Sequence, residues 1–425
     1  MLILKKIIED RNDVVHRLEI KHFANAEAMI DKVIALDTRR RAAQKELDDT
    51  LAQLNKLSKS IGALMQSGNR AEADTAKANT ATLKERIHVL SEEKEQVMAD
   101  IRELLLQIPN LPHSSVPEGT SAADNKVEKQ AGQIPELPSN ALPHWDLAEK
   151  YHLIDFELGV KISGAGFPVY IGRGARLQRA LINFFLDEAN RSGYTEIMPP
   201  TVVNADSGYG TGQLPDKEGQ MYFCNEDQLY LIPTAEVPVT NIYRDVILDE
   251  KTLPIKNCAY TECFRREAGS YGKDVRGLNR LHEFSKVELV RIDTPEHSYQ
   301  SLDEMLTHVS GLLDKLELPY RILRLCGGDM SFTSALCFDF EVFSAAQKRW
   351  LEVSSVSNFE TYQANRLKCR YRKADGKIEL CHTLNGSALA LPRIVAALLE
   401  NNQTPDAIRI PKVLVPYCGF DIIKN

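Results

Sequence analysis

The chain has 425 residues, of which 43% are apolar and 26% are charged, and its formal net charge at pH 7 is -7. This length exceeds what one hydrophobic core usually supports, so two or three domains of an ordinary soluble globular protein are expected. Proteins that bind nucleic acid without specificity are usually basic, so any RNA partner must be met by local basic patches.

Residues 25–107 contain no proline and predict an antiparallel helical hairpin over about residues 27–105. Apolar residues in the second half form a heptad seam with one polar interruption: Leu83, Ile87, Leu90, Lys94, Val97, Ile101 and Leu104. In the first half, Leu47, Leu54 and Ile61 recur every seven residues, and a Ser-Gly-Asn turn signal separates the halves. Helices of about 36 to 40 residues would each extend about 55–60 Å.

The distal part of this hairpin is locally basic. Between residues 56 and 88, six cations outnumber three anions. The cations are Lys56, Lys59, Arg70, Lys77, Lys84 and Arg86. Two interpretations stay open, namely the solvated face of a coiled coil and an arm that contacts phosphates.

The chain changes character after the hairpin. Residues 108–147 are rich in proline and predict a linker or extended lead-in, which gives expected domains of 1–107, 108–147 and 148–425. The last part mixes a helical pattern at 177–186 with strand-like runs at 228–232, 259–264, 284–292, 338–343 and 350–355. Short connections favour a mostly antiparallel sheet flanked by helices, so the expected fold class is α+β. No GxGxxG or GxxxxGK[ST] phosphate loop is present.

The eight cysteines include no CxxC pair, so we expect no structural zinc. The first residues lack a run long enough for a signal peptide, and no window approaches 18 apolar residues. We therefore expect a cytoplasmic protein with reduced thiols and no membrane contact.

Residues 264–288 read as two strands joined by a basic, glycine-bearing loop. Residues two apart share a face of a strand, so Arg265 and Glu267 are expected to point together, as are Phe284 and Glu288. Such a hairpin offers a cation, an aromatic ring and a carboxylate to one small charged ligand.

Thr234 and Glu236 stand two residues apart. If the segment is extended, a carboxylate and a hydroxyl lie side by side and bind an amine or a small hydroxyl. If the segment starts a helix, Thr234 is its cap and Pro238 lies in the first turn.

Glu352 lies within an apolar strand pattern and needs a cation, either in the core or as Mg²⁺ held with nucleotide phosphates. In a regular strand Ser355 would face the other way, so joint use of Glu352 and Ser355 requires a bulge or a strand end.

Residues 385–400 read as a strand that runs into a helix, with Pro392 and Arg393 in the first helical turn. A cation there opposes the helix dipole. Arg393 is therefore either a solvated surface residue or part of an anion site, to which Asn385 and Ser387 add polar groups from one strand face.

Together these stretches resemble the three signature motifs of class II aminoacyl-tRNA synthetases, and most closely the bacterial-type seryl-tRNA synthetase family. Motif 1 resembles residues 174–204, motif 2 residues 264–290 and motif 3 residues 386–400. The Thr-Ala-Glu triplet at 234–236 resembles the serine-binding signature of that family, and the N-terminal hairpin resembles its tRNA-binding arm. Residues 209–215, 253–256 and 326–330 also match, so the resemblance covers essentially the whole chain.

The resemblance implies a catalytic domain on a six- or seven-stranded antiparallel sheet and a homodimer formed through motif 1. It implies that L-serine attacks the α-phosphate of ATP, with Mg²⁺, to give seryl-adenylate and pyrophosphate. The seryl group then passes to tRNA(Ser), and also to tRNA(Sec) where one is present.

Residue roles follow from the same resemblance. The implied catalytic residues are Arg265, Glu352 and Arg393. The implied ATP contacts are Arg265, Arg266, Glu267, Leu281, Phe284, Glu352, Val353, Ser354, Ser355 and Arg393. The implied L-serine contacts are Thr234, Ala235, Glu236, Arg265, Glu288, Asn385 and Ser387. Glu352 and Ser355 are expected to hold Mg²⁺. The implied tRNA contacts are Lys56, Lys59, Arg70, Lys77 and Lys84 in the arm, and Lys273, Arg276 and Arg280 in the motif-2 loop.

Four positions depart from the family pattern, one of which is Tyr362, where phenylalanine is usual. Phe343 stands where tryptophan is common, Val356 where cysteine is common, and Asn365 where arginine is usual. Two other functions compete with a tRNA ligase, namely a class II-like aminoacyl ligase for a carrier protein and an inactive synthetase-like tRNA-binding protein. The first lacks a long arm in its known relatives, and the second predicts losses among the catalytic residues.

Overall fold

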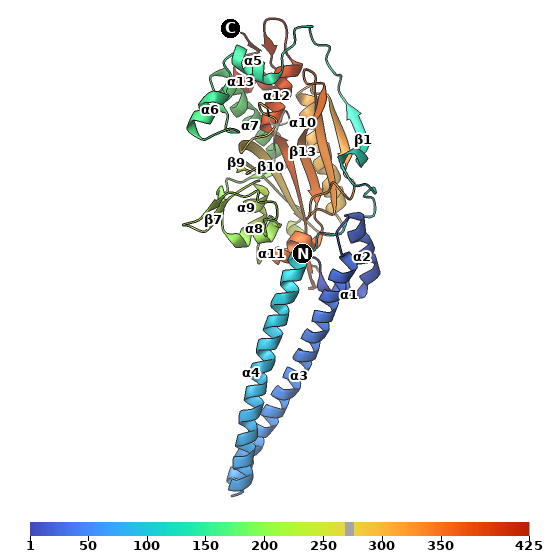
Figure 1. The fold of residues 1–425 in the computed structure, drawn as a ribbon, viewed down its shortest axis with the longest axis vertical. Helices are drawn as coiled ribbons and strands as arrows, with labels where there is room; N and C mark the ends of the chain where they lie inside the picture. Colours follow the sequence, from blue (N-terminus) through green and yellow to red (C-terminus); the bar gives the residue numbers. More distant parts are fainter. Residues whose placement is uncertain (268–275, 425) are drawn as a thin grey trace. The chain divides into compact units, whose positions relative to one another are not determined.

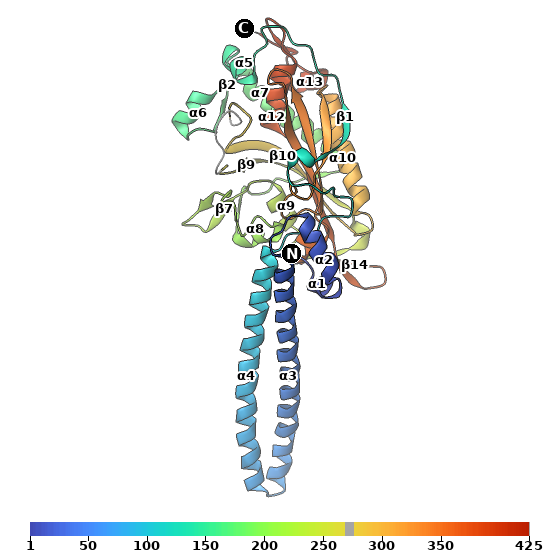
Figure 2. The ribbon, with the colours of Figure 1, turned by 45° about the vertical axis from the view of Figure 1, so that its right-hand side comes forward.

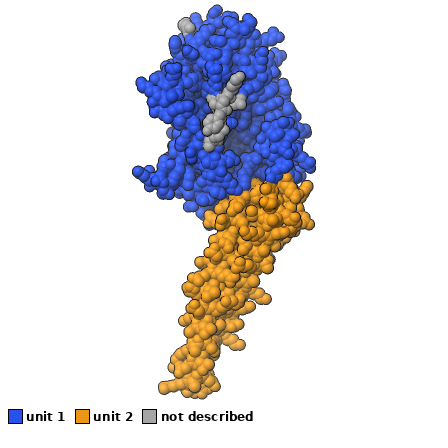
Figure 3. Space-filling model, in the orientation of Figure 1, with its two compact units in different colours: residues 1, 20–22, 110–425 blue, residues 2–19, 23–109 orange. Residues whose placement is uncertain are grey.

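The structure, a computed structural model, describes residues 1–267 and 276–424. It contains two compact units, coloured separately in Figure 3. One unit comprises residues 2–19 and 23–109, and the other comprises residues 1, 20–22 and 110–425. No helix in these ranges combines the length and the apolar character that crossing a bilayer requires.

The first unit consists of helices, and the predicted hairpin is confirmed. After α1 (Leu4–Glu9) and α2 (Arg11–Ile20), the long helices α3 (Ala26–Gln66) and α4 (Arg70–Gln107) lie side by side (Figures 1 and 2). The seam is fully buried near the base of the hairpin, as at Leu90 and Val97, and half-buried toward its tip. The ion pairs Arg39–Glu93 and Arg86–Glu46 join the two helices.

The second unit is built on an eight-stranded sheet in the order β1-β11-β12-β13-β16-β10-β9-β4. The strands in this order are Lys126–Ala131, Tyr320–Arg324, Leu336–Ser344, Arg349–Asn358, His382–Ala390, Glu283–Asp293, Ile255–Phe264 and Thr195–Glu196. All neighbours pair antiparallel except β4 with β9. The sheet therefore exceeds the six or seven strands that the resemblance implied, because residues 126–131 in the proline-rich stretch form an edge strand.

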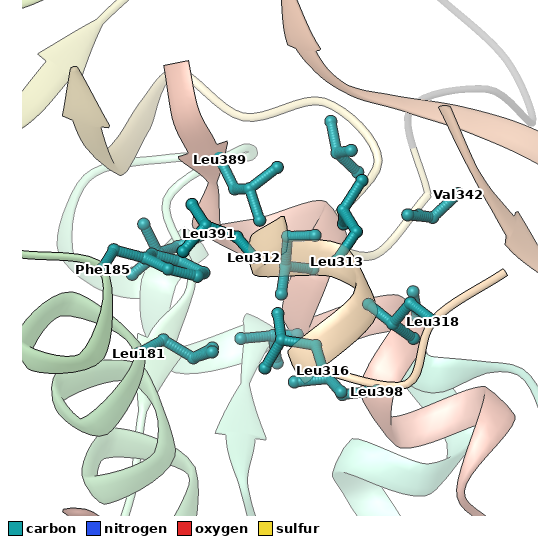
Figure 4. Packing of buried hydrophobic residues seen from close by; sticks show 14 of the residues in the cluster. Leu181, Phe185, Leu312, Leu313, Leu316, Leu318, Val342, Leu389, Leu391 and Leu398 are labelled. Carbon is teal, nitrogen blue, oxygen red and sulfur yellow. The ribbon is translucent and has the colours of Figure 1, made fainter. Parts of the chain in front are cut away.

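Three helices supply most of the packing against this sheet: α7 (Arg173–Arg191), α10 (Ser298–Lys315) and α12 (Leu391–Asn401). Their apolar side chains, including Leu181, Phe185, Leu313 and Leu398, interlock with Leu389 of β16 in one buried cluster (Figure 4). This packing holds the strands in register. The polar side chains that lie outside the apolar cluster therefore keep fixed positions relative to one another.

Smaller elements surround the sheet. The helices are α5 (His144–Lys150), α6 (Phe156–Ile162), α8 (Ala205–Thr211), α9 (Glu236–Asn241), α11 (Thr361–Leu367) and α13 (Val415–Cys418). The 3₁₀ turns are η1 (Ala122–Asp124), η2 (Glu250–Thr252) and η4 (Lys412–Leu414). The short strands are β2 (Ile154–Asp155), β3 (Val169–Tyr170), β5 (Val202–Val203), β6 (Phe223–Cys224), β7 (Leu229–Leu231), β8 (Ile247–Asp249), β14 (Arg370–Arg372), β15 (Ile378–Leu380), β17 (Ile408–Arg409) and β18 (Ile422–Ile423).

Candidate active site

Two neighbouring rows of paired strand positions bring Glu288, Ser387 and Asn385 together. Glu288 of β10 pairs with Ser387 of β16, and Asn385 of β16 pairs with Ser357 of β13. Directly paired residues of antiparallel strands place their side chains on the same face of the sheet. Glu288, Ser387, Asn385 and Ser357 therefore share one face of the sheet, and Arg265 follows the end of the neighbouring strand β9.

The first group on this face is a buried set of charges around Glu288. The Lys286 ammonium lies 2.5 Å from Glu288 Oε2 and donates to Thr234 Oγ1 at 2.9 Å. Ser387 Oγ donates to the same Glu288 oxygen at 3.3 Å. Lys286 and Glu288 are 5% and 2% exposed, so each charge depends on its partner.

Glu236 is the second buried carboxyl of this group. Its Oε1 accepts from Gln363 Nε2 at 2.6 Å, and its side chain also bonds Asn385. Burial, reinforced by the neighbouring Glu288 carboxylate, raises the pKa of Glu236 to about 7. Near neutral pH the neutral and anionic forms of Glu236 are therefore both populated.

The triplet 234–236 is a helix start and not an extended segment. α9 begins at Glu236, and the Glu236 N–H donates to Thr234 Oγ1 at 3.2 Å. The side chains of Thr234 and Glu236 still reach the same charge group, whereas Ala235 is fully buried. Of the two alternatives the helix start is confirmed, with Pro238 in the first turn, although Ala235 and not Thr234 occupies the N-cap position.

Lys286 was not predicted as a functional residue. The available signal is a lysine within a largely apolar strand, two residues before a carboxylate. Sequence reasoning identified Glu288 on this strand face and left its buried cation out.

The start of the motif-2 hairpin differs from the strand-based prediction. β9 ends at Phe264, and Glu267 has a left-handed φ of 48°. Strand alternation therefore does not relate Arg265 to Glu267, and that part of the prediction was wrong. Instead, the Arg265 guanidinium lies 5.3 Å from the centre of the Phe284 ring, and Glu267 Oε2 accepts from Arg280 Nη1 at 2.7 Å.

On β10 the prediction is confirmed, since Phe284 pairs with Cys263 and Glu288 with Ala259 on one strand face. Leu281 is buried just before this strand. The Arg266 N–H donates to Gln220 O at 2.8 Å. Lys273 falls outside the described residues.

Arg393 is held in place and is not a solvated surface residue. Its Nη1 donates to Glu352 O at 2.6 Å, and its Nε donates to Asn279 O at 2.9 Å. Burial lowers the pKa of the guanidinium, and the Glu352 carboxylate 3.7 Å away opposes that shift. A cation in the first turn of α12 is thus stabilised by backbone carbonyls and a carboxylate.

β13 contains the bulge that joint use of Glu352 and Ser355 requires. Phe340 pairs with Ser354 but Glu341 pairs with Glu352, so Val353 is the extra residue. Glu352 and Ser355 therefore face the same way, next to Asp339. Val353 and Ser354 are buried, and the side chain of Glu352 is 50% exposed, which excludes a core glutamate.

Ser355, Glu352 and Asp339 bring together several oxygen atoms that can coordinate a cation. Burial, then the Glu352 carboxylate, raises the pKa of Asp339 well above its usual value. Ser355 Oγ lies 3.1 Å from Cys337 Sγ. Carboxylate and hydroxyl oxygens are the ligands that Mg²⁺ prefers, so this donor set fits the ion together with nucleotide phosphates.

The remaining predicted positions are also placed. In the arm, Lys56, Lys59, Arg70, Lys77 and Lys84 are all exposed. Of the departures, Phe343 contacts Trp350 edge-on at 5.1 Å, Val356 is in the core, and Asn365 Nδ2 donates to Met1 O at 3.0 Å. The Asn365 side chain is therefore used in a hydrogen bond to the backbone of Met1.

Two family models match the chain. The tRNA synthetase class II core domain (G, H, P, S and T) matches residues 222–402, and the seryl-tRNA synthetase N-terminal domain matches residues 1–112. The serine–tRNA ligase of Salinibacter ruber is 52% identical over 422 residues, which cover 99% of this chain and 98% of that protein. The serine–tRNA ligase of Prosthecochloris aestuarii is 47% identical and covers 100% of this chain and 99% of its own.

Solved structures agree with these relatives. The structure of seryl-tRNA synthetase from Pyrococcus horikoshii complexed with ATP has a TM-score of 0.95 at 33% identity, and it covers 100% of this chain and 99% of that chain. The cytoplasmic serine–tRNA ligase of Naegleria fowleri in complex with AMP has a TM-score of 0.88 at 26% identity, with the same coverage.

The antiparallel sheet with its three motifs defines a class II aminoacyl-tRNA synthetase. The chain belongs to the seryl-tRNA synthetase family, and its activity is that of a serine–tRNA ligase that binds ATP and tRNA.

Proposed function

We propose that the enzyme activates L-serine with ATP on this sheet face and transfers it to tRNA(Ser). The observation that supports the proposal most is the buried group of Lys286, Glu288, Thr234 and Ser387, which lies on the same face as Glu352 and next to Arg265. It offers a carboxylate to the serine ammonium and small polar groups to the hydroxyl. Radiolabelled serine charged onto a tRNA(Ser) transcript tests this directly, and charging with another amino acid instead of serine would contradict it.

Discrimination against alanine follows from the polar character of this group. A site that hydrogen-bonds a hydroxyl rejects an analogue without it by about 10⁴–10⁵, because its buried polar groups lose their partners. Threonine must be excluded by the available space. Ser387 and Thr234 are the polar groups that alanine would leave without a hydroxyl partner, since the alanine ammonium would still meet Glu288.

For the nucleotide we propose the roles that the family resemblance implies. Arg265 neutralises charge that builds on the α-phosphate and also meets the serine carboxylate. Phe284 and Arg393 take the two faces of adenine, and Glu267 accepts from its amino group. The Glu267–Arg280 ion pair then has to open when adenine arrives. No general base is needed, since the attacking carboxylate is already ionised, and catalysis is mostly positioning and electrostatics.

We propose that Mg²⁺ is held by Glu352 and Ser355 together with the ATP phosphates. The ion supplies neutralisation of phosphate charge. The bulge at Val353 supports this assignment, because it brings the carboxylate and the hydroxyl to one side of β13.

We expect serine to bind more tightly as pH rises through neutrality. The pKa of Glu236 is raised to about 7, so the carboxyl is neutral below that pH and anionic above it. Only the anion attracts the serine ammonium, so KM for serine should fall by about three- to tenfold between pH 6 and 8 at saturating ATP. Glu236→Gln should flatten the profile. A KM that is constant or rises with pH in the unaltered enzyme would contradict this role.

The arm is proposed to contact tRNA and to take no part in serine activation. Removal of residues 29–103 should leave serine-dependent pyrophosphate exchange within about twofold of the full-length enzyme and reduce tRNA charging by at least about 100-fold. The five exposed cations of the arm support this division. In a matched variant, glutamine replaces Lys56, Lys59, Arg70, Lys77 and Lys84. This variant keeps the helices, so it distinguishes the effect of the arm's charge on tRNA charging from the effect of its length. Equal loss of exchange and charging would show that the arm belongs to the catalytic core.

We also propose a cytoplasmic homodimer formed through motif 1, with tRNA(Sec) as a second acceptor where the organism has one. Met198, which follows α7 and β4, is 91% exposed, which supports burial in a partner. The carrier-protein ligase and the inactive homologue are not favoured, because the long arm is present and Arg265, Glu288, Glu352 and Arg393 are all retained.

A further inference from the structure

A ring of buried hydrogen bonds lies beside the proposed nucleotide site and is not part of the chemistry described so far. It starts at Glu400, which is fully buried on α12 two turns after Arg393. Its carboxylate accepts from His144 Nδ1 at 2.7 Å, from the His144 N–H at 2.9 Å, from Gln347 Nε2 at 2.9 Å and from Ser344 Oγ. Burial opposes ionisation, but the bonds from His144 and Ser344 outweigh it, so the pKa of Glu400 is lowered.

His144 links Glu400 to the backbone of motif 2. Its Nε2 accepts from the Leu278 N–H at 2.9 Å, so the imidazole is the neutral tautomer with its proton on Nδ1. Gly277 has a φ of 67°, and a Cβ there would collide with His144 Nε2. The glycine therefore serves both the left-handed turn and the close approach of the imidazole.

Gln347 closes the ring on the other side. Its Oε1 accepts from Asn279 Nδ2 at 3.2 Å, while its Nε2 bonds Glu400. Asn279 O in turn accepts from Arg393 Nε at 2.9 Å. His144 of α5 thus holds the backbone at Leu278, and Gln347 of the β12–β13 turn holds the Asn279 side chain. The Asn279 carbonyl in turn holds the guanidinium of Arg393.

We propose that His144, Glu400 and Gln347 are positioning residues that set the 278–281 backbone and Arg393 for ATP. The inference rests on the proposed roles of Leu281, Phe284 and Arg393 at adenine. None of the three ring residues touches the group around Glu288, so their contribution is specific to the nucleotide. A network that only joined α5 to α12 would need no bond to Leu278 N.

The two amide substitutions of His144 separate these roles. In His144→Asn the amide keeps a donor near Glu400 but is too short to reach the Leu278 N–H. In His144→Gln the amide oxygen reaches Leu278 N, while the donor to Glu400 is lost. In pyrophosphate exchange, His144→Asn should raise KM for ATP by about five- to tenfold and leave KM for serine within about twofold. His144→Gln should keep KM for ATP within about twofold and lower the melting temperature.

His308→Asn is the matched control, because His308 bonds Ser192 Oγ at 3.1 Å and has no link to the ring. It should change neither KM. If His144→Asn does not fold, Gln347→Ala removes the bond to Asn279 and should give the same rise in KM for ATP alone. The inference is overturned if the soluble variants leave KM for ATP unchanged or raise both KM values equally. If the unaltered enzyme shows no serine-dependent exchange, the proposed function fails and this inference fails with it.

Discussion

Replacement of Arg265 by glutamine should reduce serine-dependent pyrophosphate exchange by about 10³-fold or more. The guanidinium follows the end of β9 and stacks on Phe284, where it is expected to meet the α-phosphate and the serine carboxylate. Both groups are anionic, and the phosphate gains negative charge in the transition state. Glutamine keeps hydrogen-bond donors but removes the charge, so the loss should fall mainly on kcat, measured in exchange at saturating substrates.

Arg372→Gln is a suitable control for that experiment. Arg372 is an exposed residue of β14, and its Nη1 donates to the Gly376 carbonyl in the same hairpin. This variant should exchange at the unaltered rate. An Arg265→Gln enzyme that keeps more than about a tenth of the activity would show that another group stabilises the phosphate.

Replacement of Glu288 by glutamine should lower kcat/KM for serine by about 10²- to 10³-fold. The carboxylate is 2% exposed and pairs with Lys286, so its loss removes the anion for the serine ammonium and leaves a buried lysine without its main partner. The same change should destabilise the fold by about 3 kcal/mol, since breaking a buried ion pair leaves an uncompensated charge.

Two measurements separate these effects of Glu288→Gln. Exchange kinetics as a function of serine give the loss in kcat/KM, and denaturant unfolding gives the loss in stability. Glu379→Gln on β15 is the control, because Glu379 forms an ion pair with the partly exposed Lys373. This substitution should change neither kcat/KM for serine nor the stability strongly. A Glu288→Gln enzyme that is less stable but has normal kcat/KM for serine would reduce Glu288 to a structural role.

Local patterns account for the parts of the fold that the sequence predicted correctly. The heptad seam of α3 and α4 depends on residues three and four apart, and the strands around Phe284 and Glu352 depend on alternation. Joint use of Glu352 and Ser355 was predicted to require a bulge or a strand end, and the bulge at Val353 meets that requirement. The motif resemblance supplied the residues that lie far apart in the chain.

The failures involve nonlocal contacts and turns. The pairing of β1 with β11 joins residues almost two hundred positions apart, which no local pattern reveals. Arg265 and Glu267 were assigned to one strand face, but the strand ends at Phe264. The directions of their side chains are therefore set by the turn that follows and not by strand alternation. Lys286 and the His144–Glu400 contact were missed because the role of a buried charged residue can be inferred only when its partner is known, and the sequence does not show the partner.

Pyrophosphate exchange by the unaltered enzyme, measured with each amino acid in turn, tests the central claim most directly. The proposed site predicts ATP- and Mg²⁺-dependent exchange with serine, and with alanine and threonine at rates lower by several orders of magnitude. Exchange that depends on another amino acid and not on serine would contradict the assignment of Glu288, Thr234 and Ser387 to serine.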